Sequence, residues 1–274
     1  MALLHPGAMG ASLGALLTGH GTGVAWLPAG RSPATAARAA AAGLLALGRL
    51  DELLARCPVV LSVCPPAAAR DVAAQVAAAG FGGLYVDANA VAPDSAAAIG
   101  RIVEAAGATF VDGAVIGPPV RAGGATRLYL SGPAGHRAAA WFPAGGGLDT
   151  VVLAGPPTAA SALKMCYAAW SKGTQALVLA VRAAARAHQV DEALLAEWER
   201  SQPDLAGRSD TAVASAAKAW RWSAEMAEIA ATFASAGLPP GFHRAAAEIF
   251  DRLAGFRDGD AELAAVLAAL RSGS

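Results

Sequence analysis

The chain has 274 residues, enough for two domains, and its 55% hydrophobic and 15% charged residues are typical of a globular protein and exclude a disordered one. Its 21 basic residues balance 21 acidic ones, which argues against nucleic acid or an anionic membrane as the main partner. Three cysteines without a CxxC pair indicate a reducing compartment, no disulfide framework and no zinc site or other metal site.

The first stretch, ALLHPGAMGASLGALLTGHG, predicts a short apolar strand, a glycine-containing turn and a helix, and a second strand follows at 24–27. It has neither the charged region nor the cleavage site of a signal peptide, so we expect a cytoplasmic protein. This strand–turn–helix–strand order is the context that a dinucleotide-binding turn requires.

Compared with the pattern G-x-G-x-x-G, the turn HPGAMG has His5 in place of the first glycine. Gly7 would let the backbone approach a pyrophosphate, and Gly10 would let the helix pack closely on the strand. The helix N-terminus would hold the phosphates. The predicted cofactor-binding residues of this turn are Gly7, Ala8, Met9 and Gly10. An ordinary glycine-rich turn is the alternative.

The segment after the second strand distinguishes the two nicotinamide cofactors. NAD binders usually place an acidic residue there, whereas NADP binders place a basic one. This chain has Gly30-Arg31-Ser32 and no acid before Asp51. Arg31 can meet a 2′-phosphate through its guanidinium fork, and Ser32 adds a hydroxyl donor. We therefore predict that these three residues bind NADP(H) in preference to NAD(H), with a solvated arginine in a surface turn as the alternative.

Further strands are predicted at 57–64, 84–87, 110–116, 127–131 and 150–153, with a helix at 96–106. The first of them, CPVVLSVC, is continuously apolar, as expected for a strand covered on both faces. In an open parallel sheet, ligands bind at the carboxyl ends of the strands. The predicted site residues there are Cys64, Pro65 and Asn89 for the cofactor and Ile116, Gly117 and Pro118 for the substrate. Each of these segments could equally be a plain turn.

The longest predicted helix covers 158–188 and begins after two prolines, with Thr158 as its N-cap. Its apolar residues lie on nearly every side, which is typical of a buried helix, here a spine for the second half of the chain. Lys164, Lys172 and Arg182 interrupt the apolar run, so the helix is no membrane span.

Lys164, Tyr167, Ala168 and Ser171 share one face of this helix, because they follow the spacing i, i+3, i+4 and i+7. A lysine on such an apolar helix needs either a partner or a wet cleft. We therefore expect the chemistry at Lys164.

After this helix the sequence predicts only helices, and the domain boundary lies near Gly155. The expected helices are 192–200 (with Asp191 as its cap), 209–236, 243–253 and 261–271. The predicted fold class is thus an α/β domain with a mostly parallel sheet (1–155), followed by an all-α domain (156–274) that begins with the long helix.

Several segments together resemble the β-hydroxyacid dehydrogenase superfamily, which includes 6-phosphogluconate and 3-hydroxyisobutyrate dehydrogenases and the imine reductases. They are HPGAMG, VVLSVCPP, YVDANAVAPDS, FVDGAVIGPP and ALKMCYAAWSKG, in the family's order. WRWSAEMAEIAATFASAGLP is similar to the short helical C-terminal domain of one branch. The resemblance implies that the first domain is an NAD(P)-binding Rossmann domain and that the protein is an oxidoreductase acting on a small molecule. It also implies a homodimer, here through the helical domain.

The resemblance also implies that Lys164 is the general acid/base. Tyr167 and Ser171, which share its helix face, are the predicted substrate contacts. Several polar positions of the family are missing. Ala168 replaces an asparagine, Ser171 an acid, Ile116 a substrate-binding serine and Ala224 a lysine. We therefore expect an NADP(H)-dependent enzyme that acts on a small carbonyl or hydroxy compound. The alternatives are an imine reductase or a catalytically silent NADP(H)-binding protein.

Overall fold

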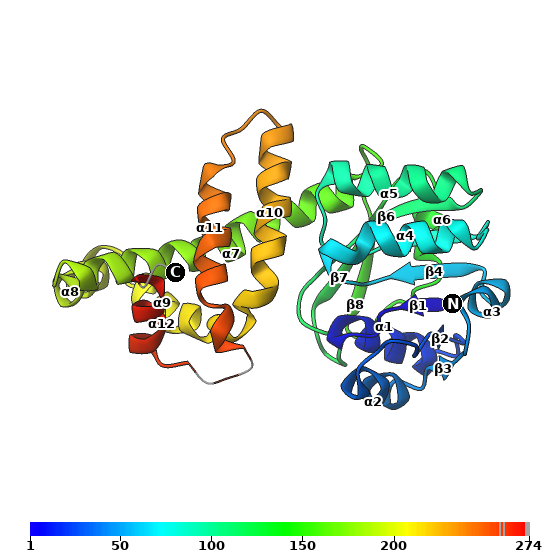
Figure 1. Cartoon of the computed structure of the whole chain (residues 1–274), viewed down its shortest axis with the longest axis horizontal. Helices are drawn as coiled ribbons and strands as arrows, with labels where there is room; N and C mark the ends of the chain where they lie inside the picture. Colours follow the sequence, from blue (N-terminus) through cyan, green and yellow to red (C-terminus); the bar gives the residue numbers. More distant parts are fainter. Residues whose placement is uncertain (258, 260, 272–274) are drawn as a thin grey trace. The chain divides into compact units, whose positions relative to one another are not determined.

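The computed structural model describes residues 1–257, 259 and 261–271 (Figure 1). The chain forms two compact units, Met1–Lys164 and Met165–Ser274. The predicted boundary near Gly155 lies at the turn before the long helix, whereas this division falls within the helix. In the described part of the chain, no helix combines the length and the apolar character needed to cross a membrane.

The first unit is built on one eight-stranded sheet (Figure 1). Its strands are β1 (Ala2–Leu4), β2 (Ala25–Trp26), β3 (Leu45–Ala46), β4 (Val59–Ser62), β5 (Leu84–Asp87), β6 (Thr109–Ile116), β7 (Thr126–Ser131) and β8 (Leu148–Val152). They lie in the order β3-β2-β1-β4-β5-β6-β7-β8, and the β6–β7 pair is antiparallel while the other neighbouring pairs are parallel. The predicted Rossmann-type α/β fold is confirmed, and its strand order reverses between β1 and β4.

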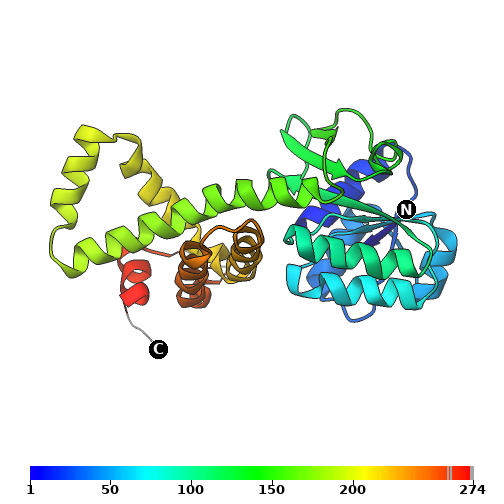
Figure 2. The same cartoon turned by 90° about the horizontal axis from the view of Figure 1, so that it is seen from above.

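Helices cover both faces of this sheet (Figure 2). They are α1 (Ala8–Gly19), α2 (Pro33–Ala41), α3 (Leu50–Arg56), η1 (Pro66–Ala68), α4 (Ala69–Ala78), α5 (Pro93–Ala105) and α6 (Gly135–Ala139). Successive strand residues enter opposite cores: Leu3 packs with Leu13 and Leu17 of α1, whereas Leu4 packs with residues of α3, α4 and α5. This alternation explains why the central strands are apolar without interruption.

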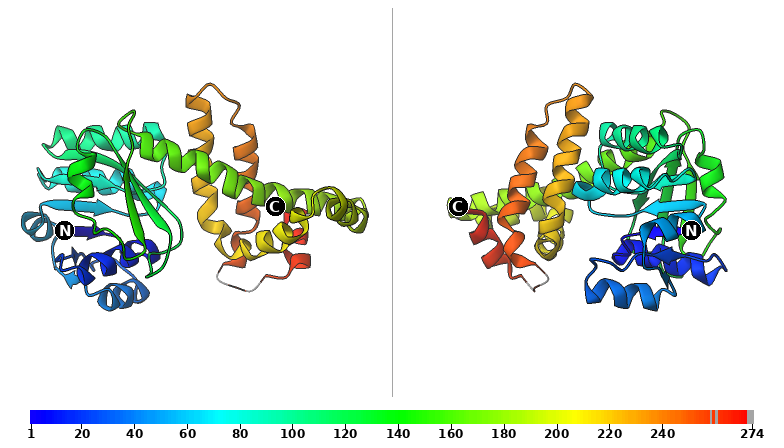
Figure 3. Two further views of the ribbon diagram at one scale, coloured as in Figure 1. Left: turned by 180° about the vertical axis from the view of Figure 1, so that it is seen from behind. Right: turned by 45° about the vertical axis from the view of Figure 1, so that its right-hand side comes forward.

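The second unit is helical, as predicted, and begins within the long helix α7 (Ala159–Ala187). The other elements are α8 (Asp191–Ser201), α9 (Asp204–Ala214), η2 (Ala216–Lys218), α10 (Ala219–Ser235), α11 (Gly241–Arg252), η3 (Ala254–Phe256) and α12 (Leu263–Arg271). Helices α10 and α11 lie side by side and are joined by a short turn (Figure 3).

Two predictions about this unit are wrong. The helix expected at 209–236 is broken: α9 ends at Ala214, and the chain tightens into η2 before α10 begins at Ala219. At this break the Ser215 hydroxyl donates to the backbone carbonyl of Ala212 (2.5 Å). Asp191 does not cap α8; Val190 is the N-cap, and the Asp191 carboxylate instead pairs with Arg182 (2.5 and 2.9 Å) and Arg186 (3.1 Å) of α7.

The long helix α7 is also not buried on every side. Tyr167, Trp170 and Leu177 are exposed by 50%, 69% and 46%. Its buried side carries mainly small residues, such as Ala168 and Ala176, which let neighbouring helices approach closely. Met165 and Leu179 are buried among them, whereas Tyr167, Trp170 and Leu177 are left on the exposed side.

Candidate functional site

The turn between β1 and α1 has the geometry of a dinucleotide-binding turn. His5, in place of the first glycine, adopts a φ of 67°, a region that glycine enters without strain. A Cβ added to Gly10 would lie 2.8 Å from the carbonyl oxygen of His5, so only glycine fits where the helix meets the turn. Nothing lies within 4 Å of a Cβ added to Gly7, so the backbone there is open to a ligand.

The first turn of α1 presents backbone N–H groups without acceptors inside the helix, including those of Ala8 and Met9. Together with the helix dipole, these groups favour an anion such as a pyrophosphate. The predicted phosphate cradle therefore fits the local backbone.

After β2, the chain turns through Gly30, whose φ is 72°, and Arg31 is exposed. Ser32 is the N-cap of α2, and its Oγ accepts a hydrogen bond from the Thr35 N–H (3.2 Å). The hydroxyl predicted to contact a 2′-phosphate therefore also holds the start of a helix. Arg31 and His5 line one cavity, together with apolar residues of α4.

The ends of β4 and β5 are joined by the amide of Asn89, which is buried. Its Oδ1 accepts from the Cys64 N–H (2.6 Å), and its Nδ2 donates to Ser62 Oγ (3.1 Å) and Asp87 Oδ2 (3.0 Å). The Asn89 N–H donates to Asp87 Oδ1 (3.0 Å). Asn89 therefore sets the position of the segment that begins at Cys64 and Pro65.

Burial changes the protonation of the groups in this network. It raises the pKa of Asp87 to about 7, and the charge of Asp112 adds to this while the hydrogen bonds from Asn89 oppose it. It also raises the pKa of the Cys64 thiol to about 12, with the Asp87 carboxylate as a second cause. Cys64 is therefore a neutral thiol at physiological pH and not a nucleophile.

The end of β6 meets the start of α7 at Lys164. The Lys164 ammonium donates to the backbone carbonyl of Val115 (2.9 Å), directly before the predicted substrate segment Ile116-Gly117-Pro118. The Ile116 side chain is buried, whereas Gly117 and Pro118 are exposed. The structure thus brings together Lys164 and the carboxyl end of β6.

A buried carboxylate holds this junction. Asp112 Oδ2 accepts from Ser131 Oγ (2.9 Å) and from the Ser161 N–H (2.8 Å), and Asp112 Oδ1 accepts from Ser161 Oγ (2.5 Å). Because the carboxylate lies at the N-terminus of α7, it also complements the helix dipole. Lys164, one turn further along, is therefore held by a helix whose start is fixed to the sheet.

The two remaining predicted substrate residues, Tyr167 and Ser171, lie in the helical unit, one turn apart on α7. Tyr167 is half exposed, and Ser171 lines a cavity formed by α7 and α9. The other lining residues of that cavity are Thr174, Gln175, Val178, Arg208 and Thr211.

The sequence reasoning missed the buried polar residues Ser62, Asp87, Asp112, Ser131 and Ser161. A signal was present for three of them, because Ser62, Asp87 and Ser131 each end a buried strand, where a polar residue is unusual. Their mutual contacts are long-range and are not visible in the sequence.

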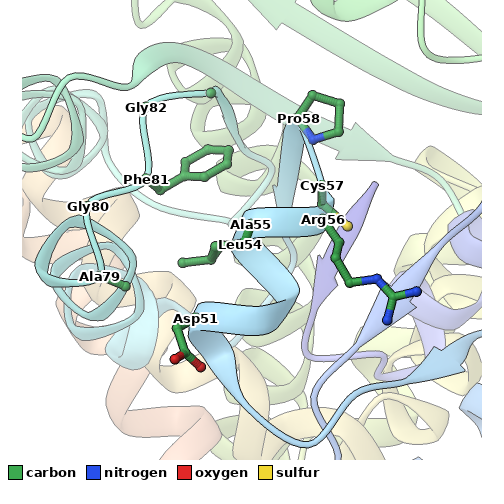
Figure 4. A pocket seen from close by; sticks show the side chains of 11 residues that line it. Asp51, Leu54, Ala55, Arg56, Cys57, Pro58, Ala79, Gly80, Phe81 and Gly82 are labelled. Atoms are coloured by element: carbon green, nitrogen blue, oxygen red, sulfur yellow. The ribbon is translucent and has the colours of Figure 1, made fainter.

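An open cavity at the opposite ends of the strands is not part of this site (Figure 4). Pro58 and Gly83, which line it, directly precede β4 and β5, so it lies at the amino ends of these strands. Among the described residues, no group of three or more His, Cys, Asp or Glu side chains could hold a metal ion.

Residues 2–140 match the family model of the NAD binding domain of 6-phosphogluconate dehydrogenase, and residues 185–253 match a domain of unknown function (DUF1932). No curated protein matches the chain. Among solved structures, a conserved protein of unknown function, MTH1747, described as similar to 3-hydroxyacid dehydrogenases, is 28% identical, with 92% of this chain and 95% of that chain covered and a TM-score of 0.68.

A conserved hypothetical protein from Sinorhizobium meliloti is 26% identical, with 98% of this chain and 94% of that chain covered and a TM-score of 0.70. The 3-hydroxyisobutyrate dehydrogenase of Mycobacterium tuberculosis, solved with L-serine, is 21% identical, with 99% of this chain and 98% of that chain covered and a TM-score of 0.71. This last likeness concerns the fold alone.

Proposed function

This chain belongs to the family of NAD(P)-dependent oxidoreductases that carry the NAD binding domain of 6-phosphogluconate dehydrogenase, and we propose that it transfers hydride between NADP(H) and a small carbonyl or hydroxy compound. In this proposal Lys164 is the general acid/base. The observation that carries it is the hydrogen bond from the Lys164 ammonium to Val115, which holds the amine at the carboxyl end of β6. In open α/β sheets, that edge is where ligands bind.

The first turn of the chain supports a dinucleotide as the cofactor. The open backbone at Gly7, the close approach at Gly10 and the N–H groups that begin α1 fit a pyrophosphate. Arg31 supports NADP(H) over NAD(H), because its guanidinium suits a 2′-phosphate and no acid stands in its place. Asn89 contributes indirectly, by holding the Cys64–Pro65 segment.

Lys164 supplies the proton part of the reaction. When bound, the nicotinamide gives or takes the hydride. The Lys164 ammonium then donates a proton to the oxygen of a carbonyl substrate, or the neutral amine accepts one from an alcohol. Val115 orients the amine before the substrate arrives, since its carbonyl accepts one of three ammonium protons. Tyr167 and Ser171 are the proposed substrate contacts further along α7.

Substitution of Lys164 tests the proposal. Lys164→Met should reduce turnover by about a hundredfold or more, because general acid–base catalysis typically contributes that much. Binding of NADPH should be unchanged. Lys218→Met, the same change at an exposed lysine of the helical unit, is the matched control. Unchanged turnover in Lys164→Met would exclude this role of the lysine.

A substrate panel separates the alternatives. NADPH oxidation would be followed with aldehydes, ketones, β-keto acids and cyclic imines, since the apolar Ile116 and Ala168 replace polar residues that the resemblance predicts. Turnover of ketones that requires Lys164 supports the proposal, whereas turnover of cyclic imines alone indicates an imine reductase. Tight NADPH binding without turnover of any compound indicates a silent binding protein.

We also propose that the protein is a cytoplasmic homodimer that associates through its helical domain. The three free cysteines fit a reducing compartment. The exposed apolar side chains of α7 support the dimer, because a surface of this kind is commonly covered by a partner.

A further inference from the structure

His5 has an unusual backbone conformation for its residue type. Among the described residues other than glycine, only His5 and Gln189 have a positive φ, and that of His5 is 67°. The same position in a dinucleotide-binding turn is normally glycine, which adopts this conformation without strain. A strained side chain kept at a ligand-binding turn suggests that the side chain itself has a function.

The surroundings of His5 indicate what that function is. Its ring lines a cavity between the end of β1, the segment after β2 and α4. Arg31 is the other titratable residue of this cavity, and the remaining lining residues are Leu4, Leu27, Leu50, Val72, Gln75 and Val76. The buried Nδ1 atom of His5 has no hydrogen-bond partner among the described residues. Most of this lining is apolar, and Arg31 and the unpaired imidazole of His5 are its two groups that can carry a positive charge toward an anion.

We infer that His5 is a second recognition residue for the 2′-phosphate of NADP(H), acting with Arg31 and taking up a proton from solvent when that phosphate binds. This inference rests on the proposed function, which supplies the cofactor. The histidine thus discriminates between NADP(H) and NAD(H), which carries a neutral hydroxyl at the same position of the ribose.

The protonation change follows from the charges in the cavity. Burial, and secondly the positive charge of Arg31, lowers the pKa of His5 to about 4, so the imidazole is neutral without ligand. A 2′-phosphate carries a charge of about −1.5 to −2 at pH 7 and favours the imidazolium, which forms a charge-assisted hydrogen bond. Binding with proton uptake strengthens as the pH falls, by up to about tenfold per pH unit.

Calorimetric titration with NADP⁺ and NAD⁺, in two buffers of different ionisation enthalpy at pH 7.5, measures this uptake directly. The wild type should take up protons with NADP⁺ and none with NAD⁺. His5→Gly relaxes the backbone, and His5→Asn keeps a polar side chain that tolerates a positive φ. Both variants should lose the uptake. For an uptake of half a proton, His5→Gly should bind NADP⁺ about twofold more weakly than the wild type at pH 7.5 and about tenfold more weakly at pH 6.5, with NAD⁺ binding unchanged.

The titration also distinguishes this inference from its premise. If His5→Gly weakens the binding of NADP⁺ and of NAD⁺ equally, His5 contacts the adenosine that both cofactors share, and the inference is overturned. Unchanged NADP⁺ binding, or unchanged proton uptake, in His5→Gly overturns it as well. Failure of the wild type to bind either dinucleotide instead overturns the proposed function. The 2′-phosphate itself titrates near pH 6 and can exchange protons on binding. The proton uptake of His5→Gly is therefore subtracted from that of the wild type.

Discussion

Asp87 and Asp112 are buried carboxylates at paired positions of β5 and β6. Burial disfavours the charged form of a carboxylate, and here it raises the pKa of both groups above the usual value. Each nevertheless accepts hydrogen bonds that connect separate segments of the chain: Asp87 from Asn89, and Asp112 from Ser161. The two carboxylates therefore hold segments together at the carboxyl ends of the strands, and the free energy needed to bury their charge depends on pH.

The pH dependence of thermal unfolding should show the free-energy cost of burying the charged form of Asp87. Its pKa is about 7 when folded and 3.8 in the reference state, so the stability it contributes is complete below pH 4 and is lost as the pH rises through 7. The full difference is roughly 4 kcal/mol. Between pH 4 and 8, Tm should fall more steeply for the wild type than for Asp87→Asn.

The difference between the two Tm profiles reports on Asp87 together with its electrostatic interaction with Asp112. The raised pKa of Asp112 acts in the same direction as that of Asp87, and the lowered pKa values of His5 and His243 act in the opposite direction below pH 6.5; these three groups are present in both proteins. Parallel Tm profiles would contradict the prediction.

Gly7 and Gly10 should respond differently to the same substitution. Alanine at Gly10 brings its Cβ to 2.8 Å from the His5 carbonyl oxygen, a backbone atom, so we expect a loss of about 1–3 kcal/mol in the free energy of unfolding. Alanine at Gly7 meets nothing within 4 Å and should leave stability unchanged, yet it should obstruct the pyrophosphate and weaken dinucleotide binding. Urea unfolding and NADPH titration of both variants check this. Equal loss of stability in the two would contradict it.

At the scale of elements, the start of α7 depends on Asp112. Asp112→Asn places an amide group beside a serine N–H or hydroxyl donor, and should lower the free energy of unfolding by about 2–4 kcal/mol because a buried network loses a partner. Ser161→Ala, which removes one hydroxyl and keeps the backbone donor, should cost only about 1 kcal/mol. Urea unfolding measures both. A cost for Asp112→Asn no larger than that for Ser161→Ala would show that Asp112 does not anchor the helix.

The bounds of strands and helices that depend on nearby residues could be predicted from the sequence. The 84–87 strand agrees with β5, and the 158–188 helix differs from α7 by one residue at each end, because prolines and apolar runs act locally. The break before α10 was missed because the residues around Ser215 are helix-forming alanines and contain neither glycine nor proline. Asp191 resembles a cap in the sequence, but its partner Arg182 becomes visible only when α7 and α8 fold against each other.

The location of the candidate site in the sheet could also be predicted from the sequence, whereas the contacts within it could not. Its positions after β1, β2, β4, β5 and β6 follow from the strand order. The internal role of Asn89 was not predictable, because its partner Ser62 lies 27 residues earlier in the chain. His5 was visible as a departure from glycine, whereas its strain and its shared cavity with Arg31 required the folded backbone.

At the scale of the whole molecule, the outer side of α7 is the main unexplained surface. Leu163, Tyr167, Trp170, Thr174, Leu177, Val181 and Ala184 follow one another at alternating steps of four and three residues. This spacing produces a continuous seam of the kind that pairs helices in coiled coils. Tyr167, Trp170 and Leu177 are exposed large side chains within it, and burying each would contribute roughly 1.5–3 kcal/mol.

Trp170 is the most exposed of these three residues, at 69%, and its replacement tests whether the seam holds a dimer. The wild type should be a dimer at micromolar concentration by light scattering after gel filtration. Trp170→Glu should shift it to monomer, because a carboxylate in a closed apolar seam loses its hydration without gaining a partner. Trp220→Glu, at an exposed tryptophan of α10 outside the seam, is the matched control and should remain dimeric. A monomeric wild type, or a dimeric Trp170→Glu, would show that α7 is not the dimer interface.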